Sequence, residues 1–186
     1  KCVEGIVTFT DTCDANTILS SLFNIYVGCV SGMESVFKHH LGDTQFIVGE
    51  NLTSQYIFPT IFPTGNPEVD TYLESNKDKL MTRKIRKMTD DNWWMWGALR
   101  NCNFVKNNLN KPCIYVKTLT RDERVAWIGT VQWFGGSLLC LFPHNQDVNL
   151  EKVVEIINSK EFREQRVRAG RFKMAQSQLL NASISY

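Results

Sequence analysis

Apolar residues in this 186-residue chain come in short runs, each broken by glycine, proline or aspartate, and this pattern restricts the possible folds most. Short apolar or β-branched runs between turn signals predict strands rather than long helices. The segments that predict strands are Ile6–Phe9, Ile25–Val30, Gln45–Val48, Cys113–Lys117, Val125–Thr130 and Ser137–Phe142. Because no run reaches the ~18 apolar residues of a membrane-spanning helix, we expect no membrane association.

Helix signals occur at three places in the sequence. Asn66 can cap a helix that has a proline in its first turn and a glutamate near its positive end. Asn149 can cap a second helix with apolar residues along one face, and a short third helix is expected at Met174–Leu180. The segment Tyr56–Gly65 holds two prolines and predicts an irregular loop. Together these signals predict an α+β fold with a mixed sheet of several short strands and about three helices.

The composition is that of a folded globular protein, with 43% hydrophobic and 22% charged residues, so a disordered chain is excluded. None of the six cysteines forms a C-x-x-C pair, and no Cys/His cluster has zinc-ligand spacing. Several stand in apolar runs, as Cys140 does. We therefore expect buried free thiols in a reducing compartment and no metal site.

Positive charge is concentrated in two segments, although the formal net charge is only +2. Lys77–Lys87 holds six cations and one acid, and Arg163–Lys173 holds five cations and one acid. The first group continues the apolar stripe of the helix that follows Asn66, and a core would not accept unpaired cations there. The segregation therefore predicts contact with an anionic partner, and a solvated helix face is the alternative.

Four segments, in order, match motifs of one protein family. They are Gly28–Phe37 (G-x-x-[ST]-G-x-N-x-x-F, with Glu34 in place of Asn), Tyr72-Leu73 with Leu80, Arg83 and Trp93-Trp94 (Y-L…L-x-x-R…W-[YW]), Ile157–Phe162 (L-N-S-x-x-[FL]), and Gly170–Lys173 with Leu179 and Ile184. From about Ile25 to Ile184, the chain thus resembles the C-terminal target-recognition domain of gamma-class (Taq-like) adenine-N6 DNA methyltransferases of restriction-modification systems. The resemblance implies the fold of that domain and the binding of double-stranded DNA.

The catalytic tetrapeptide of that family, Asn/Asp-Pro-Pro-Tyr/Phe, is absent. It holds the flipped adenine beside S-adenosylmethionine, and the nearest string here, Asn66–Val69, lacks the second proline and the aromatic residue. The resemblance therefore implies no cofactor on this chain, S-adenosylmethionine on a partner catalytic domain or subunit, and no activity of this chain alone. Because the chain begins with Lys1, we expect residues 1–24 to be a remnant or linker after that domain and residues 25–186 to be the recognition domain.

The candidate DNA-binding residues combine cations, tryptophans and amides from several segments. They are Arg83, Lys84, Arg86, Lys87, Trp93, Trp94, Trp96, Arg100, Arg121, Arg124, Gln132, Arg168, Arg171, Lys173, Gln176 and Gln178. Arginine grips phosphate or reads guanine, glutamine suits adenine, and an exposed tryptophan stacks on a base. The structural alternatives are core packing for the tryptophans, a surface turn paired with acids for Arg121 and Arg124, and a charged helix end for the segment Arg166–Gln178.

Two further functional classes are alternatives. A stand-alone nucleic-acid-binding module or specificity subunit, without enzymatic activity, would show the same basic segments. An endonuclease domain ranks last, because it requires an Asp…Glu-x-Lys metal cluster that the sequence does not offer. A type II modification enzyme implies the cytoplasm of a bacterium or, for a large DNA virus, the interior of the infected cell.

Overall fold

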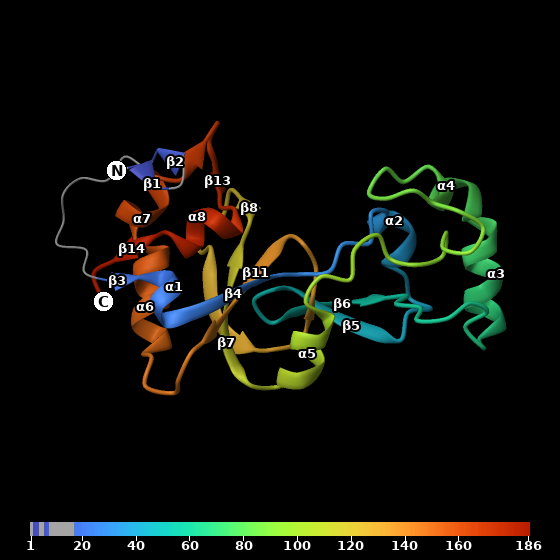
Figure 1. Cartoon of the computed structure of the whole chain (residues 1–186), viewed down its shortest axis with the longest axis horizontal. Coiled ribbons are helices and arrows are strands. Elements are labelled where there is room, and N and C mark those ends of the chain that lie inside the picture. The colour runs from blue at the N-terminus through green and yellow to red at the C-terminus, as the bar shows by residue number, and fades with distance from the viewer. Residues whose placement is uncertain (1, 4–5, 8–16) are drawn as a thin grey trace. The chain divides into compact units, whose positions relative to one another are not determined.

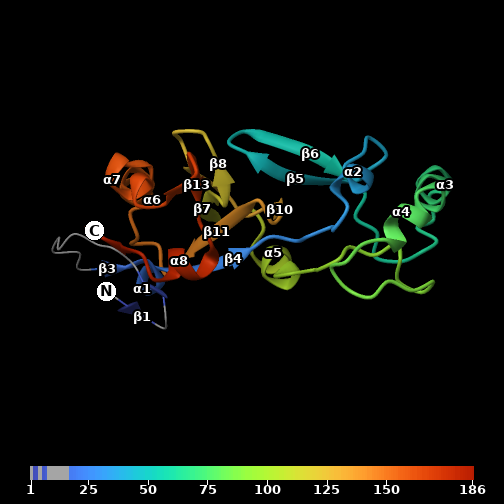
Figure 2. The ribbon, with the colours of Figure 1, turned by 90° about the horizontal axis from the view of Figure 1, so that it is seen from above.

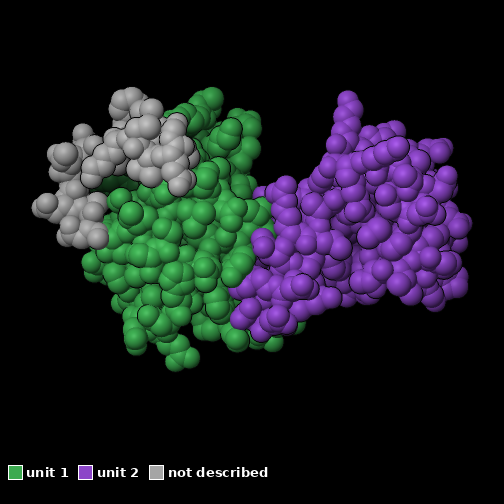
Figure 3. Space-filling model, in the orientation of Figure 1, with its two compact units in different colours: residues 1–27, 109–131, 137–186 green, residues 28–108, 132–136 purple. Residues whose placement is uncertain are grey.

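The chain forms two compact units in the computed structural model, which describes residues 2–3, 6–7 and 17–186 (Figure 3). Unit 1 consists of Lys1–Val27, Leu109–Val131 and Ser137–Tyr186, and unit 2 consists of Gly28–Asn108 and Gln132–Gly136. The units do not coincide with the ranges 1–24 and 25–186. The expected origin of residues 1–24 as a remnant or linker stays a prediction.

A four-stranded antiparallel sheet forms the centre of unit 1 (Figure 1). Its strands, in spatial order, are β4 (Phe23–Val27), β11 (Leu138–Pro143), β7 (Pro112–Lys117) and β9 (Ala126–Thr130). Consecutive residues are buried along the two inner strands, at Cys113–Val116 and Leu138–Leu141, so both faces of the sheet are covered there. The strands predicted at Cys113–Lys117, Val125–Thr130 and Ser137–Phe142 are confirmed, with ends that differ by one residue, and β7 and β9 pair with each other.

Four helices belong to unit 1: α1 (Leu19–Leu22), α6 (Leu150–Asn158), α7 (Lys160–Glu164) and α8 (Gln176–Leu180). The predicted cap of α6 is confirmed, because the side chain of Asn149 accepts a hydrogen bond from the Lys152 N–H at 2.9 Å. Val153 and Ile157 of α6 are fully buried and pack in one core with strands β7 and β9. Figure 2 shows α6 and α7 side by side, joined through Ser159, which caps α7.

Asn158, at the end of α6, fastens this helix to the sheet. Its Oδ1 accepts hydrogen bonds from the N–H groups of Val125 and Ala126 at 2.8 and 3.0 Å, and its Nδ2 donates to the Ala126 carbonyl at 2.8 Å. The side chain thus satisfies main-chain groups where β9 begins. Two residues before and four after it in the chain, Ile156 and Phe162 pack against or within the core of unit 1.

Three small sheets complete the strand pairings of unit 1. In unit 1, β8 (Leu119–Thr120), β12 (Val167–Arg168) and β13 (Arg171–Lys173) form one sheet, and β3 (Thr17–Ile18) pairs with β14 (Ser183–Ile184). The third sheet pairs β1 (Cys2–Val3) with β2 (Ile6–Val7). The predicted strand Ile6–Phe9 is confirmed for Ile6–Val7, and its other two residues lie outside the described part.

Unit 2 is built on the hairpin of β5 (Thr44–Gly49) and β6 (Leu52–Tyr56), to which β10 (Trp133–Phe134) adds a parallel strand (Figure 2). The predicted strand Gln45–Val48 is therefore confirmed. The predicted strand Ile25–Val30 ends at Val27, because the chain passes from unit 1 to unit 2 there. Cys29 and Val30 make isolated bridges to Gly135 and Ala98 instead.

The helices of unit 2 are α2 (Glu34–Phe37), α3 (Pro67–Ser75), α4 (Lys77–Met81) and α5 (Cys102–Asn108). Asn66 caps α3 as predicted, since its side chain accepts from the N–H groups of Glu68 and Val69. The α+β class is confirmed, but the described residues hold eight helices rather than about three, because many are single turns without a periodic pattern. The longest of them have nine residues, so none is long enough to cross a membrane.

A buried arginine closes the core of unit 2. Arg83 is 5% exposed, and its guanidinium lies over the ring of Phe37, 5.3 Å from the centroid. It donates to the carbonyl oxygens of Leu80 at 2.9 Å, Ser31 at 2.8 Å and Met95 at 2.9 Å, and also to that of Trp93. Burial, and secondarily the positive charge of Arg86, lower the pKa of Arg83 to about 10.

The structure gives four free thiols, Cys29, Cys102, Cys113 and Cys140, of which all but Cys102 are buried. Cys113 and Cys140 lie on the neighbouring strands β7 and β11, and the Sγ atoms of Cys29 and Cys102 are 3.3 Å apart in unit 2. Burial and the neighbouring thiol of Cys102 raise the pKa of Cys29. These sulfurs therefore pack as small apolar groups.

Replacement of Arg83 by methionine is expected to destabilise unit 2 by about 3 kcal/mol, because buried carbonyl oxygens would lose their donor. Urea unfolding followed by tryptophan fluorescence measures this, since Trp93, Trp94, Trp96 and Trp133 all belong to unit 2. The exposed neighbour provides the control, as Lys84→Met should change the stability by less than about 0.5 kcal/mol. Equal effects of the two changes would contradict the structural role of Arg83.

Replacement of Asn158 by alanine is expected to lower the stability of unit 1 by about 2 kcal/mol, because three hydrogen bonds to the start of β9 are lost. Trp127 lies on β9 and is the single tryptophan of unit 1, so its fluorescence follows this unit. The exposed Gln146→Ala serves as the control. A loss no larger than that of the control would show that Asn158 does not fasten α6.

Candidate nucleic-acid interface

A tight hairpin in unit 1 presents two of the predicted arginines. β12 and β13 are joined by Ala169 and Gly170, whose φ angles are 51° and 70°. Two positive φ angles in a two-residue loop are the geometry of a type I′ turn, which keeps the strands closely paired. Arg168 and Arg171 are therefore direct cross-strand partners at the tip.

The third strand of this sheet adds a segment that is far away in the sequence. β8 pairs with β13, with Thr120 opposite Phe172 and Leu119 opposite Lys173 (Figure 1). Arg121 follows Thr120 directly, at a bend beyond the last paired residue of β8. Since cross-strand partners share a face and neighbours along a strand alternate, one face carries Arg168, Arg171 and Lys173, while Phe172 points into the core. We call these three cations, together with Arg121 next to the end of β8, the basic strand face.

All four side chains of the basic strand face are exposed. Arg168 donates to the carbonyl oxygens of Gln165 and Val167, at 3.3 and 2.9 Å, and so lies along its own strand. Within residues 17–186, no ion pair involves any of the four, whereas the acids nearby in sequence, Asp122 and Glu164, pair with other lysines. Among the residues that the structure describes, the face therefore has no counter-charge. Leu119, opposite Lys173, is 54% exposed and adds an apolar side chain that sequence analysis had no signal to single out.

Two other arginines of the segment Arg163–Lys173 make contacts within unit 1 that stabilise the fold. The guanidinium of Arg166 stacks on Phe162 at 3.6 Å from the ring centroid and donates to its carbonyl oxygen at 2.6 Å. Burial lowers the pKa of Arg166 to about 10. Arg163 donates from Nε to the Asn158 carbonyl at 2.9 Å. The charge of this segment is thus divided between structural and exposed cations.

The remaining candidates of unit 1 are the two glutamines and Arg124. Gln178 is exposed, and its Oε1 accepts from the Ala175 N–H at 2.9 Å, which caps α8. Gln176 is half-buried, and its Nε2 donates to the Ile25 carbonyl at 2.6 Å. These contacts favour a structural role for both glutamines. Arg124 is exposed and has interactions of its own within the protein.

In unit 2, most of the tryptophan cluster belongs to the core, which corrects the expectation of base stacking for two of its members. Trp93 and Trp96 are 4% and 2% exposed, and Trp96 donates from Nε1 to the Ile57 carbonyl at 2.9 Å. Trp94 is half-buried and lies in a stacked orientation beside Phe62, with 6.2 Å between ring centroids. Of the three, Trp94 alone keeps a partly accessible ring.

The cations of the segment Lys77–Lys87 in unit 2 are also partly buried or paired and partly exposed. The burial of Arg83 argues against the phosphate contact predicted for it, because its donors are used on carbonyl oxygens within the core. Lys77 forms an ion pair with Asp90 at 2.6 Å. Lys84 and Lys87 are exposed, and Arg86 is half-buried with Nε and Nη2 buried and without a hydrogen-bond partner. The exposed Arg100 and the half-buried Gln132 complete the candidates in this unit.

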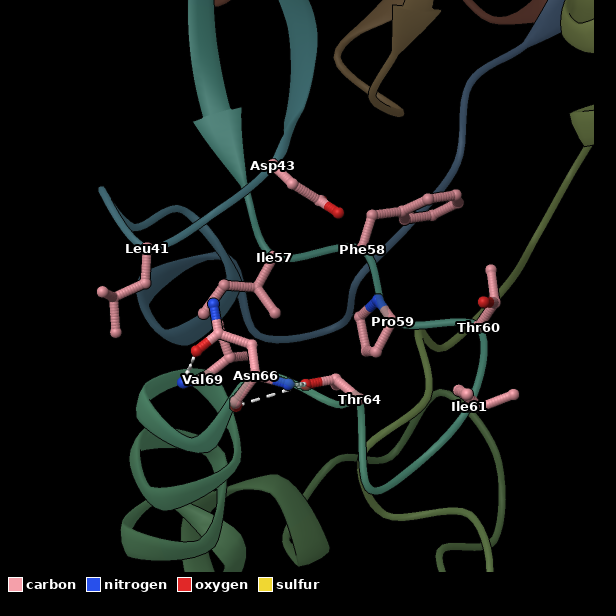
Figure 4. Close-up of a pocket in the computed structure, with 10 residues that line it drawn as sticks. All are labelled: Leu41, Asp43, Ile57, Phe58, Pro59, Thr60, Ile61, Thr64, Asn66 and Val69. Carbon is pink, nitrogen blue, oxygen red and sulfur yellow. Dashed lines mark hydrogen bonds between the residues drawn. The ribbon is translucent and has the colours of Figure 1, made fainter.

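A small cavity of about 150 Å³ lies where the loop after β6 meets the start of α3 (Figure 4). Asp43, Phe58 and Thr60 are among its lining residues, and none of the predicted contact residues is. Pockets that bury a drug-sized ligand are larger, roughly 300–1,000 Å³, so we assign no ligand to this cavity. Among residues 17–186, no cluster of three or more His, Cys, Asp or Glu side chains is arranged to hold a metal ion.

Comparison with known proteins gives one relative to report. No protein-family model matches the chain. The type II methyltransferase M.MjaIV of Methanocaldococcus jannaschii is 32% identical over 151 residues. The match covers 77% of this chain and 48% of that protein, so the chain spans about half the length of this relative. On this similarity, the chain is a partial homologue of a type II methyltransferase.

Proposed function

We propose that this chain binds duplex DNA for a site-specific DNA adenine-N6 methyltransferase. The observation that carries the proposal is the basic strand face, where three exposed cations share one side of a small sheet and a fourth, Arg121, follows the strand that pairs with them. Such a surface fits a polyanion, and the similarity to a type II methyltransferase favours DNA as that polyanion. A stand-alone binding module would leave this similarity without an explanation.

The basic strand face suits contact with the DNA backbone rather than with bases. Arginine binds a phosphate through two parallel N–H···O bonds, and a two-stranded hairpin is narrow enough to follow a groove. Phosphate contacts fix the position and orientation of a protein on the duplex but carry no sequence information. Bases would be read by other side chains, and Arg100 and Gln132 of unit 2 are the candidates with donors suited to guanine and adenine.

Methyl transfer would take place on a catalytic domain or subunit outside this chain. S-adenosylmethionine supplies the methyl group when bound there, and base flipping brings the adenine to it. The chain itself lacks the Asn/Asp-Pro-Pro-Tyr/Phe tetrapeptide that such a site requires. The role proposed for its residues is to hold and orient the duplex.

Binding to duplex DNA is expected to weaken steeply with salt. If roughly five cations touch phosphates, the slope of log K against log [salt] should be about −4 to −5. Replacing Arg171 and Lys173 together by glutamine should make the slope shallower by roughly 1.8, since each phosphate contact contributes about 0.9. Fluorescence anisotropy of a labelled duplex, titrated at several salt concentrations, measures both slopes.

The matched control is Lys160→Gln, which removes a charge from α7 in the same unit, where Lys160 pairs with Glu164. It should leave the slope nearly unchanged. Duplex binding that ignores salt, or equal effects per removed charge for the control and the double variant, would refute the role of the basic strand face.

The isolated chain is expected to transfer no methyl group to DNA. Incubation with duplex DNA and S-adenosylmethionine labelled in its methyl group, followed by counting of the washed DNA, measures transfer. An active adenine-N6 methyltransferase in a parallel reaction confirms that the assay detects the product. Label above background with this chain would show that it carries an active site, and the assignment of catalysis to another domain would fall.

A further inference from the structure

Two arginines three residues apart, Arg83 and Arg86, are in opposite states of hydrogen bonding. Every guanidinium nitrogen of Arg83 has an acceptor, four of the five acceptors being main-chain oxygens and the fifth the Met88 sulfur at 3.6 Å. Nε and Nη2 of Arg86 are buried and have none. Buried N–H groups without partners are rare in folded proteins, and each raises the free energy of the state that contains it.

The two unpartnered nitrogens of Arg86 are those of one edge of its guanidinium. The N–H groups of Nε and Nη2 point the same way, and this pair is the fork that binds two oxygens of a carboxylate or phosphate at once. No ion pair in the described part of the chain involves Arg83 or Arg86, although the charge of Arg86 is close enough to lower the pKa of Arg83. Two neighbouring guanidinium groups thus lack a counter-charge.

The segment that carries Arg86 is anchored rather than loose. The side chain of Ile85 fills the space left by two glycines, since a Cβ added at Gly97 would lie 2.4 Å from Ile85 Cγ2 and one at Gly32 would lie 3.0 Å from it. At the other end, Asn92 donates from Nδ2 to the Lys87 carbonyl at 3.3 Å. Lys84 and Lys87 are exposed on either side of this anchor. The main chain therefore presents three cations from a fixed position.

We infer that residues 84–87 form an oxyanion site in which the Nε–Nη2 edge of Arg86 binds two oxygens of a phosphate group, with Lys84 and Lys87 flanking it. Rotation of the half-buried Arg86 side chain brings that edge to the anion, and the unpartnered N–H groups gain acceptors in the same step. Free phosphate and a phosphodiester share this chemistry. That the natural ligand is a DNA phosphodiester rests on the proposed function, whereas the site itself does not.

The test compares Arg86→Met, which keeps the apolar stem, with Arg83→Met. Thermal unfolding followed by tryptophan fluorescence is recorded in sodium phosphate and in sodium chloride at equal ionic strength. We expect phosphate to raise the midpoint of the wild-type protein by more than it raises that of Arg86→Met. In chloride, Arg86→Met should be at least as stable as the wild type, because it removes two unpartnered donors. Arg83→Met should be less stable in both salts but keep the response to phosphate.

Duplex DNA forms the second arm of the experiment. If the ligand is a phosphodiester, Arg86→Met should weaken binding roughly tenfold and make the salt slope shallower by about 0.9. A phosphate response that depends on Arg86, without any DNA binding, supports the oxyanion site and overturns the proposed function. An equal phosphate response in the wild type and Arg86→Met, or a clear loss of stability of Arg86→Met in chloride, overturns the site whatever the DNA result.

Discussion

The buried guanidinium of Arg83 organises unit 2, where the sheet is small and much of the backbone is irregular. One planar cation donates hydrogen bonds to carbonyl oxygens of four residues that lie outside the strands: Ser31, Leu80, Trp93 and Met95. A neutral side chain offers too few donors, and a lysine ammonium cannot span positions fixed in a plane. The folded arrangement of this unit therefore depends on keeping one charge out of water, which only a full set of hydrogen bonds makes tolerable.

The motifs behind the family resemblance describe packing more than recognition. The buried guanidinium of Arg83 contacts the motif segments Gly28–Phe37, Leu80 and Trp93. Glu34, which stands in place of the Asn of the family motif, accepts a hydrogen bond from the Tyr56 hydroxyl at 2.6 Å. In unit 1, the motif Ile157–Phe162 begins and ends with a core residue. Between them, Asn158 binds main-chain groups at the start of β9 and Ser159 caps α7. Motifs of this kind identify relatives by their fold.

Sequence reasoning succeeded where the signal is local and stopped where it is not. The caps Asn66 and Asn149 act on N–H groups two or three residues away, and the strands of the main sheet are apolar runs with turn signals at their ends, so both were predictable. The acceptors of Arg83 and Arg163 are main-chain oxygens set by the tertiary fold, which no spacing reveals. The basic strand face was equally hidden, because it requires the two-residue strand β8 to pair with β13, some fifty positions later.

Two kinds of cation that look alike in the sequence differ in their hydrogen-bond partners. Arg83, Arg163 and Arg166 use their donors on carbonyl oxygens and are parts of the fold. Arg86, Arg121, Arg171 and Lys173 have no acceptor within the described residues that would occupy them, so their donors remain for an external anion. Since phosphate oxygens are the same in every DNA sequence, this second group would set affinity and salt dependence, and the choice of target would fall to side chains that reach base edges.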